Sequence, residues 1–264
     1  MALISHRILT ELYHPAPNSH KGDNGRLLII AGSPKYHGAL VLCATMAAKM
    51  VDLVYVHTTK DNFALIKKMR ERLAEFIYIN EKDLGHTIAE VDAILIGPGL
   101  EPNASARKLV NGILKKYPQK KILIDAGALR VVDLNLLHEN CLVTPHVGEF
   151  QAVFDLPATP ENATELSRRY PAVIVLKGRT DYICQHGQVW TNTTGNAGMT
   201  KGGTGDVLAG LLAALLTKNS PLDSASAAAY LSGRAGEELA KKEGIYYSAS
   251  ELIGVVQTLL RYKN

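Results

Sequence analysis

The stretch NAGMTKGGTGDVLAGLL, residues 196–212, joins a glycine-rich segment to an apolar one. Four glycines fall between residues 196 and 206, and glycine lets a ligand approach the main chain closely. The first N–H groups of a helix have no intrahelical partner, and the helix dipole is positive at that end. A glycine-rich turn that leads into a helix therefore predicts a site for an anion, usually a phosphate.

Asp206, at the end of this turn, is unexpected, because a carboxylate beside a bound phosphate is electrostatically unfavourable. Two roles would explain it. The carboxylate would take a proton from a hydroxyl that attacks phosphorus, or it would cap the N-terminus of the following helix. Asp is a common N-cap residue, so the residue alone leaves both roles open.

The rest of the chain alternates between segments typical of strands and of helices. The apolar run 26–32 is typical of a strand covered on both faces, and a helix is expected from about residue 39 to residue 50. We expect further strands at 53–57, 76–79, 92–97, 121–125, 141–144 and 172–177, helices at 63–74 and 105–117, a hairpin at 180–191, and helices after residue 206. This alternation predicts one α/β domain over residues 1–264, with a mostly parallel central sheet and helices on both faces.

Composition excludes several classes of protein. With 47% hydrophobic and 20% charged residues the chain can bury a substantial core. The net charge of +4, from 29 basic and 25 acidic residues, is small and dispersed, which argues against a nucleic-acid partner. The three cysteines lie far apart without C-x-x-C spacing, which indicates buried thiols in the cytoplasm. No apolar run approaches the roughly 18 residues of a membrane span, so no membrane partner is expected.

Short turns follow five of the predicted strands: Gly32-Ser33, Gly97–Gly99, Asp125–Gly127, His146–Gly148 and Lys177-Gly178. The carboxyl ends of parallel strands meet at one edge of the sheet, where open α/β sheets bind ligands. We therefore expect a long cleft with room for a nucleotide and a second large ligand. The sequence contains neither a P-loop nor a G-x-G-x-x-G fingerprint, so another architecture must hold the phosphate.

Five segments together resemble one family: KGDNGRLLIIAGSPKYHGA (21–39), GPGL (97–100), TPHVGEF (144–150), LKG (176–178) and NAGMTKGGTGDVLAG (196–210). They are similar to the NAD(P)H-hydrate dehydratases of the ribokinase-like superfamily, and the resemblance runs from Lys21 to the last helices. Many members carry an N-terminal epimerase domain, for which the residues before Lys21 are too few. The chain thus resembles the stand-alone form.

The resemblance implies a lyase that repairs hydrated NADH or NADPH. ADP or ATP phosphorylates the 6-hydroxyl of the S epimer, and loss of phosphate then restores the double bond. Asp206 matches the catalytic base of the superfamily. Mg²⁺ is expected to bridge the phosphate oxygens without a dedicated cage of protein ligands. A cytoplasmic homotetramer is expected from the same resemblance.

The resemblance also assigns binding residues. Positions that contact the hydrated dinucleotide match Ala39, Gly99, His146 and Asp206. Adenylate contacts match Lys177, Gly178, Arg179, Thr180, Asp181 and Gly205. The phosphate loop matches Gly202, Gly203, Thr204 and Gly205, whose N–H groups would hold the transferring phosphoryl group.

Two positions depart from the common family pattern. Asp125-Ala126-Gly127 stands where many members have Asp-Ala-Asp, and Lys201 stands where a small residue is frequent. Lys201 would add a phosphate contact, whereas Asp125 would cap the turn that follows it.

Simpler roles are also open for three residues near the cleft. His146 would hydrogen-bond the neighbouring backbone, and Glu149 would be a first-turn helix acid or lie near a metal. The ammonium of Lys177 would be exposed to solvent, so that its backbone matters more.

Two other functions fit part of the pattern. A ribokinase-like kinase acting on a vitamin-precursor alcohol would share the GTGD chemistry but would leave a stable phosphate ester. A non-catalytic nucleotide sensor would keep only the phosphate site, and it would gain affinity from the loss of Asp206.

Overall fold

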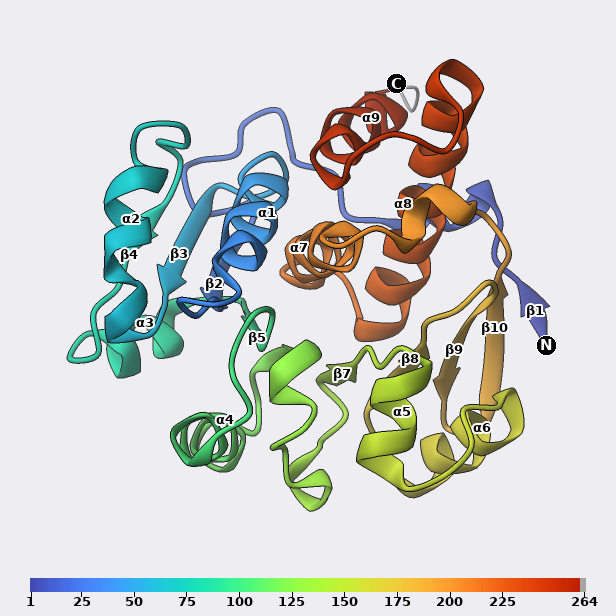
Figure 1. Ribbon diagram of the computed structural model, residues 1–264, viewed down its shortest axis with the longest axis horizontal. Helices are drawn as coiled ribbons and strands as arrows, with labels where there is room; N and C mark the ends of the chain where they lie inside the picture. The colour runs from blue at the N-terminus through green and yellow to red at the C-terminus, as the bar shows by residue number, and fades with distance from the viewer. Residues whose placement is uncertain (262–264) are drawn as a thin grey trace.

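The computed structural model describes residues 1–261, which fold around one ten-stranded sheet (Figure 1). The strands are β1 (Ala2–Leu3), β2 (Arg26–Ile30), β3 (Leu53–His57), β4 (Ile77–Tyr78), β5 (Ala93–Ile96), β6 (Lys121–Ile124), β7 (Cys141–Val143), β8 (Val173–Leu176), β9 (Asp181–Gln185) and β10 (Gln188–Asn192). Their order across the sheet is β1-β10-β9-β8-β7-β6-β5-β2-β3-β4. Within the described chain, β9 alone runs antiparallel to its neighbours, which confirms a mostly parallel sheet.

Nine α-helices occur in residues 1–261: α1 (His37–Ala47), α2 (Phe63–Met69), α3 (Leu84–Glu90), α4 (Ala104–Lys116), α5 (Val147–Phe154), α6 (Pro160–Arg169), α7 (Thr204–Leu216), α8 (Pro221–Glu243) and α9 (Ala249–Arg261). Short 3₁₀ helices are η1 (His6–Glu11), η2 (Lys60–Asn62), η3 (Ala126–Ala128), η4 (Leu134–Leu136) and η5 (Ala197–Thr200).

The helices form a layer on each face of the sheet, as predicted. Side chains of α1, α2, α7, α8 and α9 share one buried cluster with one face of the strands. Those of α3, α4, α5 and α6 share a second cluster with the opposite face (Figure 1). The central strands are apolar except for Arg26 and Lys121 at the starts of β2 and β6, as expected for strands covered on both faces.

The strand order reverses between β2 and β5, and this point positions the site. The chain moves outward through β3 and β4, returns through α3 to β5, and then continues in the other direction. Gly32 and Gly97, which follow β2 and β5, both have positive φ, and the N–H of Gly32 donates to Pro98 O at 2.8 Å. Such a switch point opens a crevice at the carboxyl edge of the sheet.

The structure confirms two local predictions. The hairpin β9–β10 turns at His186-Gly187, and both residues have positive φ. At the start of α8, Ser220 is the N-cap and accepts from the N–H of Asp223, with Pro221 in the first turn. The alanine-rich part of α8, residues 224–229, is buried in the core.

Helix prediction was less accurate between residues 63 and 170. Helix α2 ends at Met69 instead of residue 74, because the charged residues after it form turns. Helices α3 and α6 were not predicted. Helix α6 had a usable signal, since Thr159 caps it and Pro160 stands at its first position.

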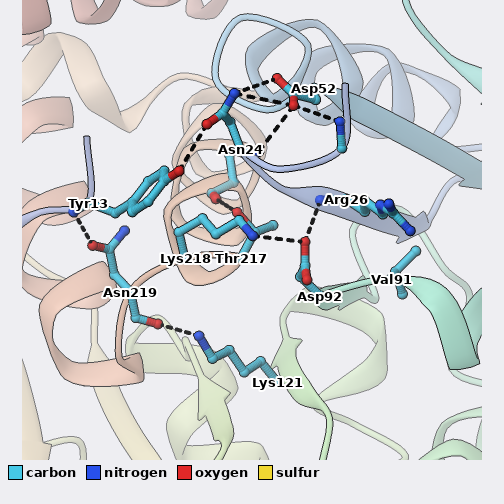
Figure 2. Close-up of polar contacts among 12 residues, drawn as sticks. Tyr13, Asn24, Arg26, Asp52, Val91, Asp92, Lys121, Thr217, Lys218 and Asn219 are labelled. Atoms are coloured by element: carbon cyan, nitrogen blue, oxygen red, sulfur yellow. Dashed lines mark hydrogen bonds and ion pairs between the residues drawn. The ribbon is translucent and has the colours of Figure 1, made fainter. Parts of the chain in front are cut away.

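The opposite, amino edge of the sheet is held by a polar network (Figure 2). Asp92, just before β5, accepts from the N–H of Arg26 at 2.8 Å and lies 3.7 Å from the Lys218 ammonium. Lys121 donates to Asn219 O at 2.8 Å, so the residues after α7 bind the starts of β5 and β6. Asn219 also accepts from the N–H of Tyr13 at 2.7 Å.

Among residues 1–261, none of the helices combines the length and the apolar character that crossing a membrane would require.

Candidate active site

A first cavity, of about 690 Å³, opens at the carboxyl ends of β2, β5, β6 and β7. Its wall includes four residues predicted to contact the dinucleotide: Ala39, Gly99, His146 and Asp206. Segments separated by more than 160 residues of sequence thus meet at the switch point between β2 and β5. The wall also carries the cationic side chains of Lys35 and Arg130.

A second cavity, of about 630 Å³, lies on the other side of the glycine turn. Its wall includes most of the predicted adenylate contacts: Lys177, Gly178, Arg179, Asp181 and Gly205. Thr180, the remaining predicted contact, is not one of the described residues that form this wall. His146 lines both cavities, which are therefore neighbours across the carboxyl edge.

Asp181 orders the turn that follows β8. Its carboxylate accepts from the N–H of Gly178 at 3.1 Å and from the side-chain amide of Asn192 at 3.0 Å. Burial raises the pKa of Asp181 in spite of these bonds.

The glycine turn separates the two cavities. Gly202, Gly203 and Asp206 line the first, and Thr204 and Gly205 line the second. Gly203 is the N-cap of α7, with φ of 97°, and a Cβ there would lie 2.7 Å from Leu42 Cδ1. The turn is therefore fixed in a shape that only glycine adopts without strain.

Asp206 is in the first turn of α7, three residues after the N-cap. The capping role is thus excluded, because Gly203 holds that position. Burial and the negative charge of Asp125 together raise the pKa of Asp206 to about 6, although the positive charge of Lys177 acts in the opposite direction. A carboxylate with a raised pKa in a cavity is a candidate general base.

Asp125 and Lys177 form a buried ion pair beneath this centre. Lys177 Nζ lies 2.9 Å from Asp125 Oδ1, which also accepts from the Thr144 hydroxyl at 2.7 Å. The three residues follow β6, β7 and β8, three adjacent parallel strands. Burial alone would lower the pKa of Lys177, but the carboxylates of Asp125 and Glu149 outweigh it, so the pKa is raised.

This pair corrects two expectations. The Lys177 side chain is only 17% exposed and not solvated, and Asp125 makes no side-chain cap for the turn after it. The pair was missed because its members lie 52 residues apart, and no local pattern reports their contact.

His146 and Glu149 cap helix α5 reciprocally. His146 Nδ1 accepts from the N–H groups of Gly148 and Glu149 at 3.0 and 3.2 Å, while Glu149 Oε2 accepts from the N–H of His146 at 2.9 Å. His146 thus hydrogen-bonds the neighbouring backbone, and Glu149 is an acid in the first turn of a helix. These are the simpler roles that the sequence left open. The imidazole of His146 still borders both cavities.

The two departures from the family pattern have local explanations. A Cβ on Gly127 would lie 1.9 Å from Leu100 O, so a side chain does not fit there. Lys201 is held by Gly198 O, by Ile245 O and by the ring of Tyr247, whose centroid is 5.0 Å away. The Lys201 ammonium therefore binds the loop after α8. The predicted contact of Lys201 with a phosphate is not supported by this position.

Family membership follows from comparison with known proteins. The family model described as NAD(P)H-hydrate dehydratase matches residues 27–258. The chain belongs to the NAD(P)H-hydrate dehydratase family. A bifunctional NAD(P)H-hydrate repair enzyme of Methanocaldococcus jannaschii is 38% identical over 92% of this chain and 50% of its own length. The chain thus spans about half of that relative.

A second relative matches along nearly its whole length. The ADP-dependent (S)-NAD(P)H-hydrate dehydratase of Nitrosopumilus maritimus is 35% identical over 92% of this chain and 91% of its own length. This coverage extends the family assignment over the full region that carries both cavities.

Solved structures share the fold of this NAD(P)H-hydrate dehydratase family member. A ribokinase-like superfamily protein of Enterococcus faecalis has a TM-score of 0.89 with 28% identity, covering 99% of this chain and 95% of the other. The ADP/ATP-dependent NAD(P)H-hydrate dehydratase of Bacillus subtilis, co-crystallised with ATP/Mg²⁺, has a TM-score of 0.83 with 25% identity, covering 99% and 98%. The predicted ribokinase-like fold is confirmed.

Proposed function

We propose that the protein dehydrates the S epimer of hydrated NADH or NADPH in a reaction driven by ADP or ATP. The names of its relatives supply the substrate and the phosphoryl donor. The observation that carries the proposal is the pair of cavities on either side of the Gly202–Asp206 turn, with a carboxylate of raised pKa between them.

In this proposal each cavity holds one substrate. The hydrated nicotinamide lies in the first cavity beside Ala39, Gly99 and His146, and the nucleotide lies in the second along Lys177–Asp181. The terminal phosphoryl group then meets the N–H groups of Gly202, Gly203 and Gly205 in the turn, which stabilise the charge that develops during transfer.

Asp206 acts as the general base. It accepts the proton of the 6-hydroxyl while that oxygen attacks phosphorus, and the shortened nucleotide leaves. Phosphate then departs from the ring with a neighbouring ring proton, and the double bond is restored. A pKa of about 6 keeps the carboxyl mostly ionised at neutral pH and close to the optimum for a base.

Mg²⁺ fits the site as a companion of the nucleotide. Within residues 1–261 no cluster of three or more His, Cys, Asp or Glu side chains could hold a metal ion. Mg²⁺ commonly binds through substrate phosphates, water and one or two carboxylates, and the Asp206 carboxylate belongs to the wall of the first cavity beside the turn. When bound, the ion would neutralise phosphate charge.

The proposal is tested by following absorbance at 340 nm after mixing the protein with hydrated NADH, Mg²⁺ and either ADP or ATP. A rise that requires nucleotide, with release of inorganic phosphate, is expected and identifies the donor. Accumulation of a stable phosphate ester without NADH would instead identify a kinase.

A further inference from the structure

A third cavity, of about 460 Å³, lies at the start of helix α4 and adjoins the first cavity. Pro102 belongs to the walls of both, and Arg130 of the first cavity is followed directly by Val131 of the third. The first cavity thus has two neighbours: it meets the second cavity at His146 and the third at Pro102. We call the third cavity the α4 pocket.

The wall of the α4 pocket is held together by side-chain hydrogen bonds. Asn103 caps α4 and accepts from the N–H of Ala106 at 3.0 Å. Asn111 donates from Nδ2 to Val131 O at 3.2 Å and accepts at Oδ1 from the N–H of Asp133 at 2.9 Å. Because these bonds tie α4 to the segment 131–133, the pocket is preformed.

The α4 pocket is cationic. Arg107 and Lys108 line it, and none of the described residues in its wall is acidic. Both side chains are exposed, and within residues 1–261 neither forms an ion pair. Pro102, Ala104 and Val131 add apolar surface on which a base can pack. This combination suits a nucleoside that carries a phosphate.

The proposed substrate needs more room than the first cavity offers. A dinucleotide consists of two nucleosides joined by a diphosphate, whereas a cavity of about 690 Å³ has the size of a site for one drug-sized ligand. With the nicotinamide half in the first cavity and the phosphoryl donor in the second, the α4 pocket is the neighbour left for the adenosine half. Arg130, at the junction with Val131, is then placed to meet the diphosphate.

We propose that the α4 pocket binds the adenosine half of the hydrated dinucleotide and that Arg107 and Lys108 recognise the 2′-phosphate of hydrated NADPH. Hydrated NADH has a hydroxyl at that position, so the protein prefers hydrated NADPH. Arg130 pairs with the diphosphate, which the two substrates share. This inference rests on the proposed function for the identity of the substrate, but it requires only binding and not turnover.

The first experiment measures the dissociation constants of hydrated NADPH and hydrated NADH by calorimetry, without a phosphoryl donor. The unchanged protein is expected to bind hydrated NADPH about 5- to 10-fold more tightly, the effect of two exposed ion pairs. Equal affinity for the two would overturn the inference. This preference without turnover in the presence of ADP or ATP would contradict only the proposed function.

A double variant tests the two cations. Arg107→Ala with Lys108→Ala should abolish the preference by weakening the binding of hydrated NADPH alone. Lys115→Ala with Lys116→Ala is the matched control, because it removes the same charge from the same helix outside the pocket wall. Arg130→Ala should weaken the binding of both dinucleotides by the same factor. A preference that survives the loss of Arg107 and Lys108, or that falls equally in the control, would overturn the inference.

A further measurement uses the unchanged protein alone. Salt screens ion pairs between exposed groups, since the Debye length falls from about 10 Å at 0.1 M to about 3 Å at 1 M ionic strength. The ratio of the two dissociation constants should therefore approach one as the salt concentration rises. A ratio that does not change with salt would contradict recognition of the 2′-phosphate by Arg107 and Lys108.

Discussion

In the proposed reaction, Asp206 must be ionised although its carboxylate is largely buried. Asp206→Asn is expected to lower turnover at least about 100-fold, the scale of a lost general base. The variant should unfold at an equal or higher temperature at pH 8, because a charge that the folded state disfavours has been removed. Kinetics at 340 nm and thermal unfolding measure the two effects. Near-normal turnover would exclude Asp206 as the base.

The Asp125–Lys177 pair predicts opposite shifts of the pH profile. A base with a pKa of about 6 must be deprotonated, so kcat/KM should fall as the pH drops below about 6. Asp125→Asn removes a charge that raises the pKa of Asp206, and the acid limb should move to lower pH. Lys177→Met removes an opposing charge, and the limb should move to higher pH.

Titration of kcat/KM between pH 5 and 8 is the appropriate measurement, because a purely structural role would lower activity without moving the limb. Shifts of the two variants in the same direction would contradict the electrostatic account. Other groups that bear on Asp206 are Cys43, whose thiol donates to Asp206 O, and His146, Glu149, Lys35 and Arg130 of the first cavity.

At the scale of elements, the position of α7 depends on its contact with α1. A Cβ on Gly210 would lie 2.7 Å from Cys43 O and 2.9 Å from Cys43 Cα, which are backbone atoms of α1. Gly210→Ala should therefore push α7 away, with a loss of about 1–3 kcal/mol in the free energy of unfolding. Turnover should fall as well, because Asp206 lies one turn away on the same helix.

Gly112→Ala is the control for this prediction. Gly112 is in α4, is exposed, and has open space where a Cβ would be. Alanine there should raise the free energy of unfolding by about 0.5–1 kcal/mol. Denaturant unfolding compares the two variants. An equal change in the free energy of unfolding for Gly210→Ala and Gly112→Ala would show that the α1–α7 contact tolerates a methyl group.

Elements differed in how well the sequence predicted them. The central strands β2, β5 and β6 were predicted because continuous apolar runs are characteristic of doubly covered strands. Short helices such as α3 were missed, since seven residues hold less than two periods of a helical pattern. The cleft was predicted because parallel topology brings every strand exit to one edge. The ion pair beneath Asp206 was not, because it depends on contacts across three strands.

At the scale of the whole molecule, binding and stability lie at opposite edges of the sheet. Helix α7 connects the two edges: it starts at the Gly202–Asp206 turn and ends next to Lys218 and Asn219, about 20 Å away along its axis. The amino-edge network in Figure 2 holds that far end. This arrangement separates the residues around the two cavities from those that anchor the far end of α7.

Asp92→Ala tests that separation. The change leaves the N–H of Arg26 without its acceptor and should cost about 1–3 kcal/mol in the free energy of unfolding. Turnover and ADP affinity should stay within about twofold, because α1 and α8 still hold α7 near Asp206. Glu81→Ala, which removes an exposed ion pair with Lys60, should cost no more than about 1 kcal/mol. A loss of turnover in Asp92→Ala at temperatures where it is fully folded would mean that α7 transmits disorder from one edge to the other.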